Sequence, residues 1–419
     1  MLDNGISWAE WHDLGNQACL SGKKDLGMKL YDVAVSVASS EVERVGTLAA
    51  IACERLLSRD DVAWCVKALE DKSALASANH NDFINLSTAY LRLPYPEKAL
   101  GAARVANILD PVNAGVCGNV ALSYGMLGDY VQEEKWSRRA ARLDSNLRYQ
   151  YAMVRMKLID QPTDEDWLDF SFDYDSRKKP MADHLIHRLN IYKPGPVIVC
   201  QEQGIGDFLM IARAFKWLKD FGCQPTLYTK DLEVAELANT GFGIQVKTDA
   251  TLAGSYKYCI HSMDLLQYRN QWINYSTLDV AWNEVIRKDE KGGIGVNFTG
   301  NPGFEFEYTR GCYDSWFKDE VKGFIGQEEL RDLSVRSPSL LALSERISNL
   351  KAVVTTDTMI AHMAGILNVP CLVMLAPNKD WRWFQQWYGP TFQTVTQAAV
   401  GDWQSILPDV QKFVKENRG

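Results

Sequence analysis

The chain has 419 residues, of which 46% are hydrophobic and 23% are charged, and its formal net charge is −8 at pH 7. A chain of this length is too long to fold around one small hydrophobic core, so we expect two or three domains. The acidic total gives no basis for tight, nonspecific binding to nucleic acid, and the composition contains no low-complexity tract.

Cysteine and histidine usage favours a reduced, metal-free, cytoplasmic protein. Nine cysteines are scattered without a Cys-x-x-Cys pair, and an odd count in a long chain favours free thiols over a disulfide framework. The six histidines show no His-x-x-x-His or His-Glu-x-x-His spacing, so we expect no dedicated zinc site. The N-terminal stretch lacks a basic start followed by an apolar run, and no apolar run approaches about 18 residues. We therefore predict neither a signal peptide nor a membrane span.

Residues 1–160 show the spacing of a helical repeat. Tyr90 and Tyr124 are 34 residues apart, and so are Ala106 and Ala140. Small residues at such positions let two helices approach, and aromatic residues fill the groove between them. The pattern resembles the tetratricopeptide repeat, whose units stack into a superhelix with a concave face that usually binds a partner. We expect a TPR-like array here, which either binds a protein partner or serves as a structural cap for the next domain.

Basic residues gather near the end of this region. Between positions 135 and 157 there are seven of them against a single aspartate: Lys135, Arg138, Arg139, Arg142, Arg148, Arg155 and Lys157. The simpler interpretation is a solvated helix face, and the alternative is a surface that contacts DNA.

After a connector expected at 161–193, which contains prolines and a run of acidic residues, strand-like and helix-like segments alternate. This alternation predicts parallel sheets with crossover helices, in two Rossmann-like α/β domains at 194–290 and 291–419. Three polar turns follow predicted strands: 203–207, 299–303 and 355–358. Ligands in open α/β sheets bind at the carboxyl ends of the strands. We therefore expect the three turns to line one cleft between the two domains.

The turn at 355–358 is the best candidate for an anion site. The helix that follows it presents free backbone N–H groups and the positive end of its dipole, which favour a negative ligand. The hydroxyls of Thr356 and Thr358 add donors on either side of Asp357. His362 lies one helical turn further on, where it either contacts the same anion or is an ordinary buried histidine.

The other two turns carry weaker signals. The Gly-Ile-Gly-Asp turn at 204–207 is neither a full dinucleotide fingerprint nor a P-loop. Asp207 stands at the start of a predicted helix, where a carboxylate can accept a proton or simply cap the helix. Arg310 could offer a fixed positive charge to a diphosphate, or pair with Glu305 or Glu307 on the surface.

Four segments resemble the GT-B glycosyltransferases of the heptosyltransferase type, especially the bacterial and phage versions fused to tetratricopeptide repeats. In chain order they are QEQGIGDFLMIARAF, GVNFTGNPGFEFEYTR, VTTDTMIAHMAGILNVPCLVMLAPNKDWRWF and WYGPTFQTVTQAAVGDWQSILPDV. The resemblance implies transfer of a sugar from a nucleoside-diphosphate sugar, which is a co-substrate and not a cofactor. It also implies that no metal is required.

The resemblance implies roles for particular residues as well. Asp207 matches the acidic residue that acts as general base on the acceptor hydroxyl in an inverting transfer. The implied donor site consists of Gly206, Asn301, Arg310, Gln327, Thr356, Asp357, Thr358 and His362. Within it, Asp357 and Thr358 hold the donor phosphates or sugar, and Asn301 and Arg310 lie against the diphosphate.

The acceptor stays open between a glycan, a protein and a hydroxymethylated base in phage DNA, because some phage DNA sugar transferases are also GT-B enzymes. A DNA acceptor would require base extrusion and salt-dependent binding, and the basic residues at 135–157 are its only support. The alternative function is a non-catalytic interaction protein, in which the repeats bind a partner and a degenerate GT-B region is structural.

Overall fold

The computed structural model describes residues 6–58, 62–93, 95–174, 189–190, 193–249, 256–275, 292–300 and 311–418. The chain divides into two units, Met1–Asp144 and Ser145–Gly419.

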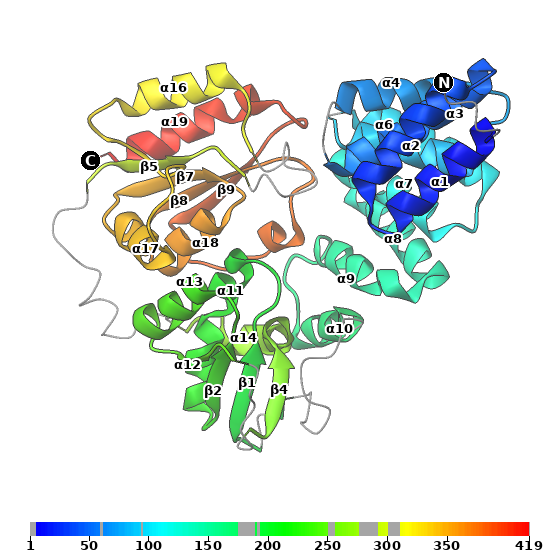
Figure 1. The fold of residues 1–419 in the computed structure, drawn as a ribbon. Helices are drawn as coiled ribbons and strands as arrows, with labels where there is room; N and C mark the ends of the chain where they lie inside the picture. Colours follow the sequence, from blue (N-terminus) through cyan, green and yellow to red (C-terminus); the bar gives the residue numbers. More distant parts are fainter. Residues whose placement is uncertain are drawn as a thin grey trace. The chain divides into compact units, whose positions relative to one another are not determined.

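The first unit is a helical repeat array, as predicted. Its helices are α1 (Trp8–Leu20), α2 (Lys24–Val37), α3 (Glu41–Ser58), α4 (Val62–Ser73), α5 (His80–Leu91), α6 (Pro96–Leu109), α7 (Ala114–Met126) and α8 (Tyr130–Leu143). Each helix packs against the next one along the chain (Figure 1). The unit therefore has the nearest-neighbour packing that is typical of helical repeats.

Small residues and a tyrosine hold α1 against α2. A Cβ placed on Gly15 would lie 2.6 Å from the ring of Tyr31, so the two helices meet closer than any larger residue permits. The Tyr31 ring is buried, and its hydroxyl donates to Asn16 Oδ1 at 2.7 Å. In later repeats, Ala106 and Ala140 are also buried. At these positions small residues let the helices approach and a tyrosine fills the space between them, as expected.

The boundary between the units differs from the predicted one. The repeats were expected to run to 160, but the division falls after Asp144, and α9 (Arg148–Met156) belongs to the second unit. The expected connector contains a helix, α10 (Asp164–Tyr174), whose Trp167 and Phe170 are fully buried. The acidic residues that suggested a linker form the first turn of this helix, where the dipole stabilises negative charge.

The second unit contains two parallel sheets. The four-stranded sheet has the order β3-β2-β1-β4, and the five-stranded sheet has the order β6-β5-β7-β8-β9. The strands are β1 (Pro196–Cys200), β2 (Gln224–Tyr228), β3 (Gln245–Lys247), β4 (Tyr258–His261), β5 (Ile294–Asn297), β6 (Leu330–Asp332), β7 (Ala352–Thr356), β8 (Cys371–Leu375) and β9 (Phe392–Thr396). All paired strands in both sheets run parallel, as the alternating pattern predicted.

Helices cover the sheets and supply the groups of the site. They are α11 (Ile205–Ile211), α12 (Arg213–Asp220), α13 (Leu232–Glu236), α14 (Arg269–Trp272), α16 (Ser315–Ile325), α17 (Leu340–Ser348), α18 (Met359–Ile366) and α19 (Leu407–Glu416). Short helical turns occur at η2 (Leu237–Gly241), η3 (Ser262–Tyr268), η5 (Trp381–Phe384) and η6 (Trp403–Ile406). Helices α16 and α19 pack on one face of the five-stranded sheet, and α17 and α18 pack on the other (Figure 1).

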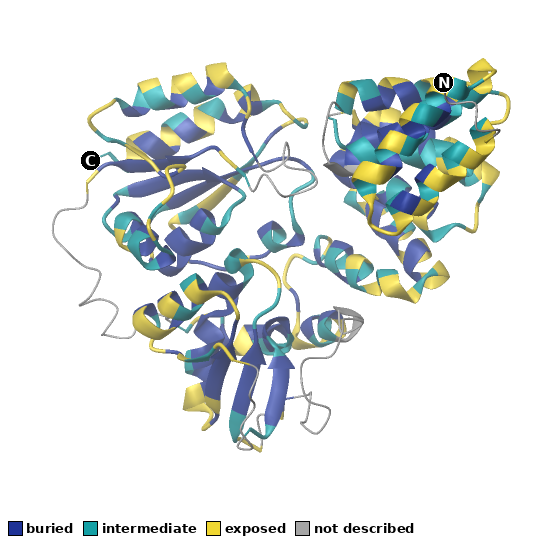
Figure 2. Cartoon of the chain, viewed as in Figure 1, coloured by how far each residue is buried: buried dark blue, intermediate teal, exposed yellow. Residues whose placement is uncertain are grey.

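The two α/β domains share one hydrophobic core. That core joins buried residues of β1, α11 and α12 to those of α17, α18 and the segment 381–388. The outer face of the five-stranded sheet, under α16 and α19, has a separate core. Strands β1, β2, β4, β5, β7 and β8 are buried along most of their length, whereas β3, β6 and β9 are exposed or half-buried (Figure 2). Burial of apolar side chains between the two domains therefore stabilises their association, in addition to the covalent chain that links them.

Tryptophans from three parts of the second unit form the centre of the shared core. The ring centroid of Trp387 lies 5.9 Å from that of Trp167 on α10 and 6.1 Å from that of Trp381. Trp387 also stacks on Trp272 of α14, with 6.5 Å between centroids. The segment that carries Trp381 and Trp387 thus connects the five-stranded sheet to the helices of the other domain.

The repeat packing predicts opposite effects for two Gly→Ala substitutions. Gly101 lies inside α6 with open space around its Cα, so Gly101→Ala should stabilise the first unit by about 0.5–1 kcal/mol through helix propensity. Gly15→Ala has the same intrinsic gain but drives a methyl group into Tyr31, so it should destabilise by about 1–3 kcal/mol. Urea denaturation measures both values, and equal stabilisation by the two would contradict this packing.

Candidate functional site

A cavity of about 610 Å³ lies between the two α/β domains, at the carboxyl ends of β5 and β7. We call it the first cavity. Three polar turns contribute to its wall, at 204–207, 299–300 and 357–358. The expectation that polar turns from both domains share one cleft is confirmed for these residues.

The first turns of α11 and α18 touch at Gly206. A Cβ on Gly206 would lie 2.9 Å from His362 Cδ2 and 3.7 Å from Met359 Cα. Even alanine at this position would therefore require His362 to shift. Gly206 lines the first cavity, and its missing side chain is what lets the two helices meet there.

Asp207 belongs to an ion pair that crosses between the domains. Its Oδ2 accepts a hydrogen bond of 3.0 Å from the backbone N–H of Gly204, so it caps α11, and its Oδ1 accepts from Arg382 Nη2. The side chains of Asp207 and Arg382 are only 13% and 12% exposed. Arg382 also pairs with Asp380, at 2.7 Å. In this structure Asp207 is both a helix cap and an ion-pair partner.

Sequence reasoning did not single out Arg382. It is part of the Asp-Trp-Arg-Trp stretch within the third quoted segment, and nothing in its spacing shows that it reaches Asp207. The structure makes it a cation in the wall of the first cavity, where its guanidinium contacts Asp207 of the turn at 204–207.

Asn297 at the end of β5 was also missed, although it organises the polar side of the cavity. Its Nδ2 donates to Thr299 O at 3.0 Å and to Thr355 Oγ1 at 3.2 Å, and its Oδ1 accepts from Thr299 Oγ1 at 2.9 Å. Thr355 Oγ1 in turn lies 3.1 Å from Thr358 Oγ1. Asn297 is 2% exposed, so these bonds replace the ones it would make with water.

The structure corrects the role of Thr356. Its side chain is fully buried and does not line the cavity, and its hydroxyl has no hydrogen-bond partner among the described residues. Side chains alternate along a strand, so on β7 Thr355 lies on the α18 side of the sheet, with Val353, while Thr356 lies on the opposite side, with Val354. The polar pair is therefore Thr355 with Thr358.

His362 combines both alternatives that the sequence left open. It is 4% exposed, stacks on Trp383 with 4.9 Å between ring centroids, and has Nδ1 2.9 Å from Tyr388 Oη. Burial raises the pKa of the Tyr388 hydroxyl far above its ordinary value, so this group stays protonated and can donate to Nδ1. The other edge of the His362 ring, near Gly206, lines the first cavity.

The remaining predicted residues divide into three groups. Asp357 and Thr358 line the first cavity as expected. Gln327, which the resemblance assigned to the donor site, does not, because it lies in the exposed turn before β6, at the amino end of that strand. Asn301 and Arg310 lie outside the described residues.

The basic residues between 135 and 157 are divided between the two units. Several of them contact other residues of their own unit. Arg138 pairs with Glu134 at 2.6 Å, Arg139 donates to Pro111 O at 2.6 Å, and Arg155 lies 3.4 Å from Asp169. These contacts favour the simpler interpretation of the run over a DNA surface.

The described residues lack both a candidate metal cluster and a candidate membrane span. They contain no group of three or more His, Cys, Asp or Glu side chains that could hold a metal ion. Within the same residues, no helix has the length and the apolar character that crossing a membrane requires.

No family model matches the sequence, and no curated protein matches it either. Several solved structures are similar in part. E. coli heptosyltransferase WaaC with ADP-2-deoxy-2-fluoro heptose is 12% identical, covers 53% of this chain and 99% of its own, and has a TM-score of 0.38. An O-GlcNAc transferase mutant from Thermobaculum terrenum is 10% identical, and the match covers 90% of this chain and 94% of the transferase, with a TM-score of 0.31. A thermophilic TPR protein from Thermus thermophilus is 18% identical, and the match covers 40% of this chain and 89% of the TPR protein, with a TM-score of 0.34.

The Asn297 network predicts a loss of stability. Asn297→Ala leaves the hydroxyls of Thr299 and Thr355 without their buried partner, so it should lower the free energy of unfolding by about 1–3 kcal/mol. Ser334→Ala, at an exposed position of the same cavity wall, should change it by less than about 0.5 kcal/mol. Thermal or urea denaturation checks both, and equal effects would show that the network contributes nothing.

Proposed function

We propose that the second unit is a glycosyltransferase that moves a sugar from a nucleoside-diphosphate sugar to a hydroxyl acceptor, with the donor in the first cavity. One observation carries the proposal. Asp207 and Asp357, which the family resemblance assigns to different parts of one reaction, lie in the wall of one cavity beside Arg382. The cavity volume, about 610 Å³, lies within the range of small-molecule sites.

The start of α18 suits the donor diphosphate. The N-cap residue Thr358 makes no side-chain hydrogen bond to the first turn, so backbone N–H groups of that turn can face a ligand. The helix dipole favours a negative group there, and Arg382 of the same cavity wall can offer its guanidinium once a diphosphate displaces Asp207. Asp357 would repel phosphate oxygens, so we assign it to hydroxyl groups of the donor sugar or ribose.

In the proposed reaction, Arg382 changes partner. The free site holds Asp207 in an ion pair with Arg382, and a bound diphosphate competes for the same guanidinium. Asp207, once released, takes the proton from the acceptor hydroxyl as the acceptor oxygen bonds to the anomeric carbon. The bond from that carbon to the diphosphate oxygen breaks, with inversion, and the leaving group keeps the electron pair.

Arg382 and the start of α18 stabilise the charge that develops on the leaving diphosphate, which is the task that a metal ion performs in other transferases. The proposed mechanism is therefore metal-independent. Asn301 and Arg310 remain proposed as further contacts of the diphosphate. His362 supports the site through its fixed ring, and a glycan or a protein is the proposed acceptor. Hydroxymethylated DNA is a weaker candidate, because several residues of the basic run already have partners within the protein.

Donor binding is the first test. Purified protein should be stabilised by one class among UDP-, ADP-, GDP-, CDP- and dTDP-sugars, by about 2.7 kcal/mol at 100 times the dissociation constant. Asp357→Ala should remove most of that stabilisation, whereas Asp319→Ala, an exposed acid on α16, should keep it. If no nucleotide sugar stabilises the wild-type protein, the alternative of a non-catalytic interaction protein is favoured.

The role of Asp207 needs a rate measurement. With the donor identified as above, Asp207→Asn should bind it but release nucleoside diphosphate about 10²–10⁴ times more slowly, even with water as acceptor. Asp231→Asn removes a carboxylate that caps α13 in the same domain and should leave the rate unchanged. Equal rates for Asp207→Asn and wild type would remove Asp207 as the base.

A further inference from the structure

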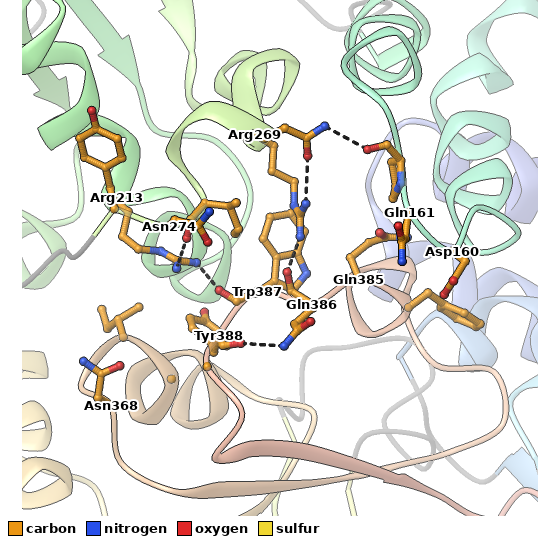
Figure 3. A pocket seen from close by; sticks show the side chains of 18 residues that line it. Asp160, Gln161, Arg213, Arg269, Asn274, Asn368, Gln385, Gln386, Trp387 and Tyr388 are labelled. Atoms are coloured by element: carbon orange, nitrogen blue, oxygen red, sulfur yellow. Dashed lines mark hydrogen bonds between the residues drawn. The ribbon is translucent and has the colours of Figure 1, made fainter.

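A second cavity, of about 900 Å³, lies beside α12 and α14 on one side and the segment 384–389 on the other (Figure 3). Its lining is rich in amide side chains, including Asn270, Asn274 and Gln386, and it contains two arginines, Arg213 and Arg269. None of these residues lines the first cavity.

Arg213 is buried with its positive charge. It is 8% exposed, donates from Nη1 to Ile273 O at 2.7 Å and from Nη2 to Trp387 O, and lies over the ring of Tyr388 at 5.3 Å (Figure 3). Its Nε has no hydrogen-bond partner among the described residues. A guanidinium has five N–H groups, so two carbonyl bonds leave most of them available.

Arg269 is in the same situation. It is also 8% exposed, donates to Gln386 O and to Asn270 Oδ1, and lies over the ring of Trp387 at 4.5 Å. Within the described part of the chain its Nε likewise has no partner. Its contacts with the described residues are all with neutral groups.

Two buried positive charges thus lie near each other, and among the described residues no carboxylate pairs with either of them. Neither arginine forms an ion pair with any described residue, and the only acid in the cavity lining, Asp160, is exposed. Burial lowers the pKa of both guanidinium groups, and Arg213 adds to the effect on the pKa of Arg269, which falls to about 10. A buried charge is costly unless it is paired, so this arrangement is suited to an anion from outside.

We propose that the second cavity binds a polar small molecule that carries a phosphate or carboxylate group, with that group placed between Arg213 and Arg269. Guanidinium groups bind both oxyanions through paired N–H donors. The amides of Asn270, Asn274 and Gln386 suit the neutral polar part of the same molecule. The inference concerns a separate site and does not depend on the proposed glycosyl transfer.

Isothermal titration calorimetry at constant ionic strength tests whether the second cavity binds an anion. Inorganic phosphate, glucose 6-phosphate and glucuronate are the probes, and uncharged glucose is the control. At least one anion should bind the wild-type protein at or below about 10 mM, and glucose should not. Arg269→Gln should weaken that binding at least about tenfold, which is what losing one charged hydrogen bond of about 1.4 kcal/mol gives. Arg331→Gln removes the same charge from the exposed strand β6 and should leave affinity unchanged.

A second variant covers the case in which Arg269→Gln does not fold. Gly389 lies in the cavity lining, and a Cβ there would meet nothing within 4 Å, so Gly389→Phe should fill the cavity without disturbing the core. It should also weaken anion binding about tenfold or more, whereas Asp357→Ala in the first cavity should not. The proposal is overturned if no anion binds the wild type, or if binding survives in Gly389→Phe. Preference for the phosphates or for glucuronate then identifies which oxyanion the site takes.

Discussion

The approach of α11 to α18 is the constraint on which the first cavity depends. Gly206 has no side chain, and this lets the start of α11 lie directly against His362 and Met359 on α18. The polar turn before each helix is thereby brought to the same place, although the turns are about 150 residues apart in the chain. The ion pair between Asp207 and Arg382 then forms across that junction, in a partly dry setting where it is stronger than on the surface.

The segment 381–388 serves both cavities. Arg382 lines the first cavity, while Trp387 and Tyr388 line the second. Tyr388 also contacts His362, so one hydrogen bond connects the walls of the two cavities. The arginines of the second cavity hold the same segment through the carbonyl groups of residues 386 and 387. A ligand in either cavity would therefore act on a segment whose aromatic rings are fixed in the shared core.

Patterns local in sequence predicted the repeats, the parallel sheets and the meeting of the polar turns, because periodicity and strand–turn–helix order are local properties. Long-range contacts were not predictable in this way. Arg382 reaches Asp207 across 175 positions, and Asn297 looked like an ordinary strand residue. The sequence pattern indicated Thr356 where the structure has Thr355 bonded to Thr358. An error of one position on a strand is enough for this, because neighbouring strand residues face opposite sides of the sheet. Gln327 does not reach the first cavity, because it precedes the short strand β6 and so lies at the amino end of that strand.

The single core shared by the two α/β domains has a consequence for how the protein works and how it can be dissected. Turning one sheet away from the other would expose Trp272 and Trp387 to water, at a cost of several kcal/mol. The shared core thus opposes any change in the angle between the sheets. For the same reason, a cut near residue 291 would not yield two halves that fold independently, and residues 145–419 should unfold as one cooperative body.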